Sequence, residues 1–251
     1  MWCIRRIEPF TSIFTGKYIA FVGSGGKTTL IEYLAAQGSR AGRSVAVTTT
    51  TKIFVREPYV LAEKRTRGPA APGTVLRVGK TLEDGKLTAL TLDDVLELGR
   101  DFDRVLVEAD GSKGLPLKYP AEYEPVIPPF SDQVVVVAGL DGLGGRVDER
   151  VFRWELFTGA SGIDGSAVVT PRVVERLFAG DGVFKGVRRD RAMVILNKYD
   201  ACMERSEALG VARTLLAATN VDRVVVSSLR LDIFYGVEAE SRRSATGIQL
   251  A

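Results

Sequence analysis

The segment 18–30 constrains the fold of this chain more than any other stretch of its sequence. Residues 18–22 form an apolar run typical of a buried strand, residues 23–26 are rich in glycine, and residues 29–37 have a helix-forming composition. Glycine lets backbone N–H groups point into such a loop, and the helix N-terminus adds a partial positive charge. Between loop and helix stand Lys27, suited to neutralise outer phosphates, and Thr28, whose hydroxyl is suited to bind Mg²⁺. This order of elements predicts a site for nucleotide phosphates.

The glycine loop is shorter than the usual phosphate loop. In the pattern G-x-x-x-x-G-K-[ST] a glycine would stand at position 21, where this chain has Phe21, and the first glycine is Gly23. The loop is therefore shorter by two residues and is similar to the Gly-x-x-Gly-Lys-Thr loops of the Mur ligases. The alternative interpretation is a glycine-rich strand-to-helix turn in a doubly wound domain, without a ligand.

Apolar runs and helical stretches alternate along the rest of the chain. Strands are predicted at 44–48, 74–78, 104–108, 133–138, 192–196 and 223–226, and helices at 91–99, 149–160, 171–178 and 204–218. Residues 1–17 are expected to form a short helix or an edge segment, and the tail from residue 238 to be frayed. The alternation predicts an α/β fold, a three-layer P-loop NTPase-like architecture with a mostly parallel central sheet. We expect a single nucleotide-binding domain over residues 1–251, with an irregular, proline-rich functional loop near 115–130.

Carboxylates and hydroxyls follow two of the predicted strands. Glu108 and Asp110 follow the apolar residues 105–107 at the end of the strand predicted at 104–108, where a Walker B acid belongs. Such acids are costly to desolvate without a cation, and a Mg²⁺ ion that bridges phosphates needs an anionic oxygen. The threonines at 48–51 offer further hydroxyls, with Thr51 assigned as a metal ligand, although threonine also simply favours strands. Ligands collect at the carboxyl ends of parallel strands, so these residues are expected to share a site with Lys27.

The segment Asn197-Lys198-Tyr199-Asp200 fits the Asn-Lys-x-Asp pattern with which GTPases read guanine. In that role the aspartate accepts hydrogen bonds from the guanine N1 and exocyclic amine, and the asparagine faces the O6/N7 edge. The segment follows a predicted strand, and a later strand ends at residues 227–229, where GTPases place a base-contacting loop. The pattern also arises by chance in many chains, so adenine stays an alternative base.

The composition excludes several kinds of site. The chain has no histidine and only two cysteines, which excludes a Ser-His-Asp triad, imidazole zinc sites and a disulfide framework. Any metal is therefore expected to be a hard, oxygen-bound ion such as Mg²⁺. A net charge of +3 with interspersed charges indicates neither nucleic acid nor a membrane as a partner. No apolar run approaches about 20 residues, and residues 1–6 lack the apolar core of a signal peptide, which predicts a cytoplasmic protein.

Together these motifs resemble those of the YqeC-type accessory proteins of selenium-dependent molybdenum hydroxylases. The resemblance spans residues 18–200 and departs at residues 152–155, which are Phe-Arg-Trp-Glu where the family tends to have His-Arg-Pro-Glu. It implies a role in the maturation of a molybdenum hydroxylase, with that enzyme or its cofactor as a partner. The segments that carry it are 22–30 (VGSGGKTTL), 48–53 (TTTTKI), 107–114 (VEADGSKG), 116–118 (PLK), 124–128 (EPVIP), 182–186 (GVFKG) and 196–200 (LNKYD).

The leading hypothesis is a Mg²⁺-dependent nucleoside triphosphatase, with GTP or ATP as ligand, that serves as a maturation factor. One alternative is an ATP-dependent ligase or kinase, suggested by the short Mur-like loop. Another is a non-hydrolysing protein that binds a nucleotide-containing molybdopterin cofactor. The assigned catalytic residues are Lys27, Glu108 and Asp110, the assigned metal ligands are Thr28, Thr51, Glu108 and Asp110, and the assigned nucleotide-binding residues are Gly23, Ser24, Gly25, Gly26, Lys27, Thr28, Thr29, Asn197, Lys198 and Asp200.

Overall fold

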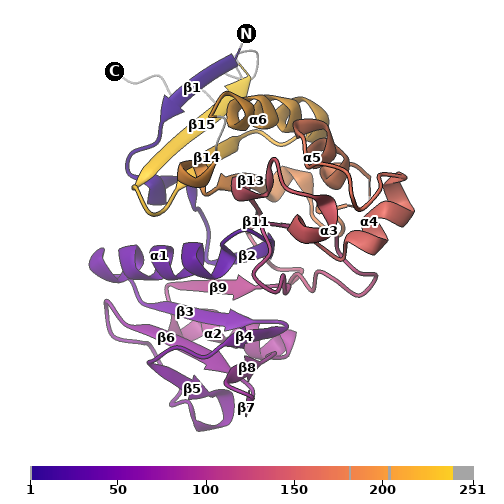
Figure 1. The fold of residues 1–251 in the computed structure, drawn as a ribbon. Coiled ribbons are helices and arrows are strands. Elements are labelled where there is room, and N and C mark those ends of the chain that lie inside the picture. The colour runs from indigo at the N-terminus through magenta and orange to yellow at the C-terminus, as the bar shows by residue number, and fades with distance from the viewer. Residues whose placement is uncertain (1, 181, 203–204, 240–251) are drawn as a thin grey trace, which may run out of the picture.

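Ten strands form one continuous sheet in the computed structural model, which describes residues 2–180, 182–202 and 205–239 (Figure 1). The eight strands from β14 to β5 run parallel, and β15 runs antiparallel to both of its neighbours, β14 and β1. In sheet order the strands are β1 (Trp2–Arg6), β15 (Ile233–Ala239), β14 (Val224–Ser228), β13 (Ala192–Asn197), β11 (Gln133–Gly139), β2 (Tyr18–Gly23), β9 (Arg104–Glu108), β3 (Val45–Thr49), β6 (Val75–Gly79) and β5 (Tyr59–Leu61).

Successive residues of the central strands face opposite layers of the molecule. In β2, Ile19 and Phe21 pack with α1 (Lys27–Arg40) and the 3₁₀ segment η1 (Phe10–Ile13), whereas Ala20 and Val22 pack with α5 (Pro171–Phe178) and α6 (Arg205–Thr219). Val107 pairs in register with Ala20 and packs with α2 (Leu92–Asp101), so α2 covers the same side as α5 and α6. Both faces of the sheet are covered, which explains why its strands are continuous apolar runs. The expected three-layer α/β fold with a mostly parallel central sheet is confirmed.

Capping residues fix the ends of two predicted helices. The Thr91 hydroxyl accepts a hydrogen bond from the Asp94 N–H at 3.1 Å, and the Asp94 carboxylate accepts one from the Thr91 N–H at 3.3 Å, which is a capping box before α2. Thr170 caps α5, and Pro171 occupies the first helical position, where its missing N–H costs nothing. The helices expected at 91–99 and 171–178 are therefore confirmed.

The prediction of one helix over 149–160 is wrong, because three short elements occupy this segment. They are α3 (Val147–Arg150), β12 (Val151–Phe152) and α4 (Trp154–Ser161). β12 pairs in parallel with β10 (Leu117–Lys118), and Arg153 adopts a left-handed backbone conformation with φ of 63°. At residues 151–153, pairing of β12 with β10 in the proline-rich loop thus outweighs the local preference for a helix.

β15 and a small antiparallel sheet have no counterpart among the elements predicted from the sequence. Residues 238–239, expected to be frayed, belong to β15, while residues 240–251 lie outside the described part. The small sheet has the order β4 (Lys52–Phe54), β8 (Lys86–Thr88) and β7 (Leu82–Glu83). The remaining 3₁₀ segments are η2 (Ala62–Lys64), η3 (Leu140–Gly142), η4 (Arg189–Arg191) and η5 (Tyr199–Ala201). Among the described residues, no helix is both long enough and apolar enough to cross a membrane.

Candidate functional site

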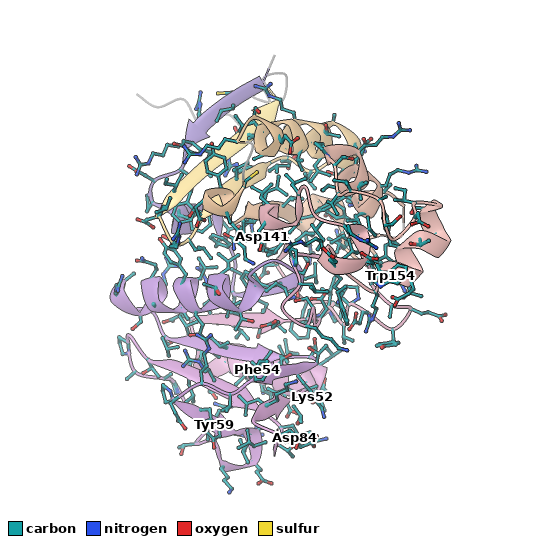
Figure 2. All side chains as sticks on the ribbon, in the orientation of Figure 1. Lys52, Phe54, Tyr59, Asp84, Asp141 and Trp154 are labelled. Carbon is teal, nitrogen blue, oxygen red and sulfur yellow. The ribbon has the colours of Figure 1, made fainter. Side chains whose placement is uncertain are left out.

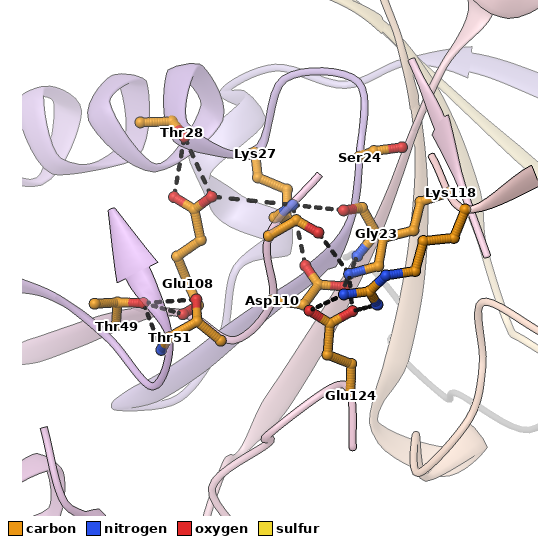
Figure 3. Close-up of polar contacts among 12 residues, drawn as sticks. Gly23, Ser24, Lys27, Thr28, Thr49, Thr51, Glu108, Asp110, Lys118 and Glu124 are labelled. Carbon is orange, nitrogen blue, oxygen red and sulfur yellow. Dashed lines mark hydrogen bonds and ion pairs between the residues drawn. The ribbon is translucent and has the colours of Figure 1, made fainter. Parts of the chain in front are cut away.

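The carboxyl ends of three neighbouring strands bring the glycine loop, the acids and the threonines together (Figure 3). β9 lies between β2 and β3, and its last residue, Glu108, pairs in register with Phe21 on one side and Thr49 on the other. The glycine loop continues from β2, and residues 50–51 continue from β3. Parallel strands end at the same edge of a sheet, which is why segments far apart in the sequence meet here.

The glycine loop packs closely against the backbone of β11, and this contact requires glycine. A Cβ atom on Gly23 would lie 2.2 Å from the carbonyl oxygen of Val137, and one on Gly25 would lie 2.1 Å from the backbone nitrogen of Gly139. Both loop glycines also have positive φ, 92° and 80°, which other residues rarely adopt. Gly26 is the N-cap, and α1 begins directly after it at Lys27.

The first N–H groups of the loop bind other parts of the protein. Gly23 donates to Asp110 Oδ2 at 2.9 Å, Ser24 to the carbonyl of Val137 at 2.9 Å, and Gly25 to the carbonyl of Leu115 at 3.3 Å. The Ser24 hydroxyl donates to another backbone carbonyl, that of Pro116. The first N–H groups of an α-helix have no partner within the helix. A phosphate at this loop would therefore meet the N-terminus of α1, where Lys27, Thr28 and the exposed Thr29 lie.

Lys27 is buried, and its ammonium group lies between the loop and two carboxylates. Its Nζ is 3.0 Å from Asp110 Oδ1 and 3.9 Å from Glu108 Oε1, and it donates a hydrogen bond to the carbonyl of Gly23. To bind a phosphate, Lys27 would exchange Asp110 for a phosphate oxygen. Asp110 would then keep one charged partner, because Lys118 Nζ lies 2.9 Å from its Oδ2.

Thr28 and Glu108 provide oxygen atoms of the kind that Mg²⁺ prefers. The Thr28 hydroxyl lies 3.0 Å from Glu108 Oε2 and 3.3 Å from Oε1. Burial raises the pKa of Glu108, although the Lys27 charge and the Thr28 hydrogen bond act in the opposite direction. The described residues include no group of three or more His, Cys, Asp or Glu side chains that could hold a metal. One hydroxyl and one carboxylate thus fit Mg²⁺ as an ion completed by water and phosphate oxygens.

The pH dependence of stability should reveal the buried carboxyl of Glu108. Its raised pKa means that the folded protein binds this proton more readily than the unfolded chain does, so the associated stability is present at low pH and is lost as pH rises through the folded pKa. Gln at this position resembles the protonated form and does not titrate. The unfolding free energy of Glu108→Gln minus that of the wild type should therefore increase from about pH 4 to about pH 8. Urea titrations at a series of pH values measure this difference, and a flat or falling difference would mean that the Lys27 ion pair outweighs burial.

The threonines at 48–51 mostly hydrogen-bond to backbone carbonyls. Thr48, Thr49 and Thr50 donate to the carbonyls of Val78, Glu108 and Val126, respectively, at 2.7 to 2.8 Å. Thr51 lies beside Thr49, with 3.2 Å between the hydroxyl oxygens, and is the most accessible of the four. Lys52, by contrast, lies with Phe54 on the small sheet and pairs with Glu83 at 2.8 Å (Figure 2).

Ion pairs continue from Asp110 away from the glycine loop. Lys118 Nζ lies 2.9 Å from Asp110 Oδ2 and 2.7 Å from Glu124 Oε2, and both terminal nitrogens of Arg153 donate to the Glu124 carboxylate. Burial acts to raise the pKa of Glu124, but the hydrogen bonds and charges of Lys118 and Arg153 hold it below its ordinary value. We call this alternating series the charge chain; its members are Glu108, Lys27, Asp110, Lys118, Glu124 and Arg153.

The second half of the charge chain, which is Lys118, Glu124 and Arg153, is not among the site residues predicted from the sequence. Lys118 and Glu124 stand within segments that carry the family resemblance, which is the signal that could have assigned them to the site. Their pairing depends on how the loop near 115–130 folds back onto β9, which no local pattern reveals.

The Asn-Lys-x-Asp segment lies on the other side of the loop, at the end of β13. The Asn197 amide donates to the carbonyl of Gly25 at 3.0 Å and thus ties β13 to the loop. Asp200 accepts from the Ser228 hydroxyl at 2.6 Å and from Arg230 Nε at 2.7 Å, and these hydrogen bonds lower its pKa. Lys198 has a left-handed backbone and pairs with Asp141 at 2.7 Å; Figure 2 labels Asp141 above α1 and β2.

The chain is similar to known proteins over the segment that contains most of this site. Residues 19–155 match the YqeC protein family. The Escherichia coli (strain K12) protein named "Uncharacterized protein YqeC" is 34% identical over 199 residues, which cover 73% of this chain and 77% of that protein. The whole charge chain, from Lys27 to Arg153, falls inside the family match, whereas the segment 197–200 lies outside it.

Proposed function

The chain belongs to the YqeC family, and we propose that it binds a nucleoside triphosphate with Mg²⁺ at the glycine loop and hydrolyses it. The observation that carries this proposal is the position of Lys27 at the start of α1, directly after a glycine loop and within 4 Å of two buried carboxylates. A buried ammonium group at a helix N-terminus attracts a phosphate group.

Each residue of the site has a distinct part in the proposed chemistry. Lys27 would leave Asp110 and stabilise charge on the outer phosphates, while Lys118 keeps Asp110 neutralised. Thr28 and Glu108 would hold Mg²⁺, which would neutralise negative charge on the phosphate groups when it is bound. Asn197 would fix the loop against β13 through its hydrogen bond to Gly25.

We further propose a role in the maturation of a selenium-dependent molybdenum hydroxylase. Support for this role comes from the ordered run of family motifs between residues 22 and 200. The exposed side chain of Tyr123 and the half-exposed Val126 lie on the proline-rich loop next to the charge chain, and a client protein or its cofactor would be contacted there.

A calorimetric titration of the full chain with GTP, ATP and CTP, with and without Mg²⁺, tests the proposal. We expect Mg²⁺-dependent binding of a triphosphate and slow release of inorganic phosphate. Turnover that begins only when an acceptor is added would favour a ligase or kinase, which the short loop also suggests. Tight binding without phosphate release would favour a nucleotide-containing cofactor as ligand, and no binding of any nucleotide would contradict the proposal.

Base preference provides a separate prediction at Asp200. If the segment 197–200 reads guanine, Asp200 must release Arg230, whose side chain is 74% exposed and therefore free to move. Asp200→Ala should then weaken GTP binding about tenfold or more, and leave ATP binding nearly unchanged, because one charge-assisted pair of hydrogen bonds is lost. The same calorimetric titration measures both. Equal binding of GTP before and after the change would show that Asp200 only holds Ser228 and Arg230.

A further inference from the structure

The positive charge of Lys113 lies next to the glycine loop. Its side chain is exposed, and within the described residues no Asp or Glu lies within ion-pair distance of it. Its basic neighbours Lys118 and Arg153 differ in this respect, because Asp110 and Glu124 neutralise them. The group around Lys113 is thus left with a surplus of positive charge.

A tight turn holds Lys113 at a fixed place beside the loop. Lys113 and Gly114 both have positive φ, 48° and 78°, and the Leu115 N–H donates to the Ser112 carbonyl at 3.1 Å, as in a type I′ turn. The carbonyl of Leu115 in turn accepts from the Gly25 N–H. A lysine with positive φ is uncommon and persists where the surroundings hold it in place. Lys113 is therefore anchored to the loop and differs from an ordinary surface lysine.

The ring of Phe152 gathers three cationic groups. The Arg153 Cζ atom lies 4.8 Å from the ring centroid, Lys113 Nζ 5.5 Å and Lys118 Nζ 5.9 Å. Attraction to the aromatic ring offsets part of the repulsion among like charges brought this close together. The ring of Phe152 is thus a contact that Lys113 and Arg153 share when no anion is present.

Arg153 keeps hydrogen-bond donors for a ligand. Its three hydrogen bonds, two to Glu124 and one to the Tyr123 hydroxyl, use three N–H groups, and a guanidinium group has five. The side chain of Arg153 is 19% exposed, so it is partly accessible to solvent. A planar donor group beside a flexible ammonium group suits an oxyanion.

We propose that Lys113, Arg153 and the ring of Phe152 form a binding site for the phosphate or carboxylate group of a second ligand. In the order of contacts, Lys118 and Asp110 stand between this site and Lys27, because Lys118 contacts the Phe152 ring and pairs with Asp110, which in turn pairs with Lys27. The site does not include the phosphate loop, so its test stands whether or not a nucleotide binds at Lys27.

Titration of the full chain with inorganic phosphate and, separately, with acetate tests the second site. An ionic strength of about 0.15 M screens non-specific attraction. Lys113→Ala should weaken binding of one or both anions by about tenfold or more, because a charge-assisted hydrogen bond is lost, and Lys113→Arg should restore most of it. Lys64→Ala is the matched control, since Lys64 is also exposed and follows the distant edge strand β5; it should leave binding unchanged.

The two anions identify the chemistry of the second ligand. Loss of phosphate binding alone on Lys113→Ala indicates a phosphate group, and loss of acetate binding alone indicates a carboxylate. If the wild type binds neither anion, or if Lys113→Ala binds both as the wild type does, the second site does not exist. If phosphate binds only at the glycine loop, Lys113→Ala will bind phosphate as tightly as the wild type does. The nucleotide titration of the unchanged chain decides the proposed function independently.

Discussion

Replacing Asp110 by alanine is expected to lower the free energy of unfolding by about 3–5 kcal/mol, because two buried lysines would lose their common partner. The side chain of Asp110 is 3% exposed, and those of Lys27 and Lys118 are 1% exposed. Neither ammonium group can regain water without a rearrangement of the site. Urea titration measures the change as a shift of the midpoint with little change in slope.

Two further variants sharpen this prediction. Asp110→Asn keeps the shape of the side chain and removes its charge. Its free energy of unfolding should therefore lie between those of the wild type and Asp110→Ala. Asp190 pairs with Arg188, and both side chains are more than 60% exposed, so Asp190→Ala should change stability little. If Asp110→Ala lowered the free energy of unfolding as little as Asp190→Ala does, the prediction would be wrong, and water would have to reach Lys27 and Lys118 freely.

The large effect expected at Asp110 does not mean that the charge chain makes the protein stable. Removing one partner of a buried pair is costly, but replacing all partners by well-packed apolar residues is often neutral or stabilising. Six charged residues in series, beginning with Glu108 at the end of β9, therefore fit the proposed ligand binding better than a role in folding. In the proposed binding step, Lys27 exchanges the carboxylate of Asp110 for a phosphate oxygen.

The layers of the fold could be predicted from the sequence because its buried strands are uninterrupted apolar runs. β9 and β11 are recognisable for this reason, and capping residues such as Thr91 mark helix ends. The segment 149–160 was predicted wrongly because its helical composition competes with pairing between β12 and β10, a contact between distant parts of the chain. β15 was missed because its pairing with β1 joins the two ends of the described chain.

The first half of the candidate site could be located in the sequence, and the second half could not. Lys27, Thr28, Glu108 and Asp110 stand at strand ends, where the parallel topology brings them together. Lys118 ends the two-residue strand β10 and Glu124 lies in the loop after it, so their positions follow from long-range pairing and from hydrogen bonds such as that of Lys118 to the Gly111 carbonyl at 2.6 Å. Local sequence patterns do not encode such contacts.

Replacing Lys27 by methionine is expected to weaken binding of a Mg²⁺-nucleoside triphosphate about hundredfold or more. The ammonium group of Lys27 is the one in the described site that directly follows the glycine loop, and a lost charge-assisted hydrogen bond corresponds to about 1.5–3 kcal/mol, or one to two powers of ten in affinity. Loss of the positive charge beside Glu108 and Asp110 adds repulsion toward the phosphates. Calorimetric titration with the nucleotide preferred by the wild type measures the change.

Lys118→Met is the matched control, because Lys118 is as buried as Lys27 and pairs with the same carboxylate at nearly the same distance, 2.9 against 3.0 Å. Both variants should lose stability, so both must be compared at a temperature at which they stay folded. Among the described residues, Lys118→Met leaves Lys27 as the one ammonium group that pairs with Asp110. This should hold Lys27 back from the phosphates and weaken binding by at most about tenfold. Equal weakening in the two variants would mean that disruption of Asp110 explains both, and Lys27 would lose its assignment as the phosphate-binding residue.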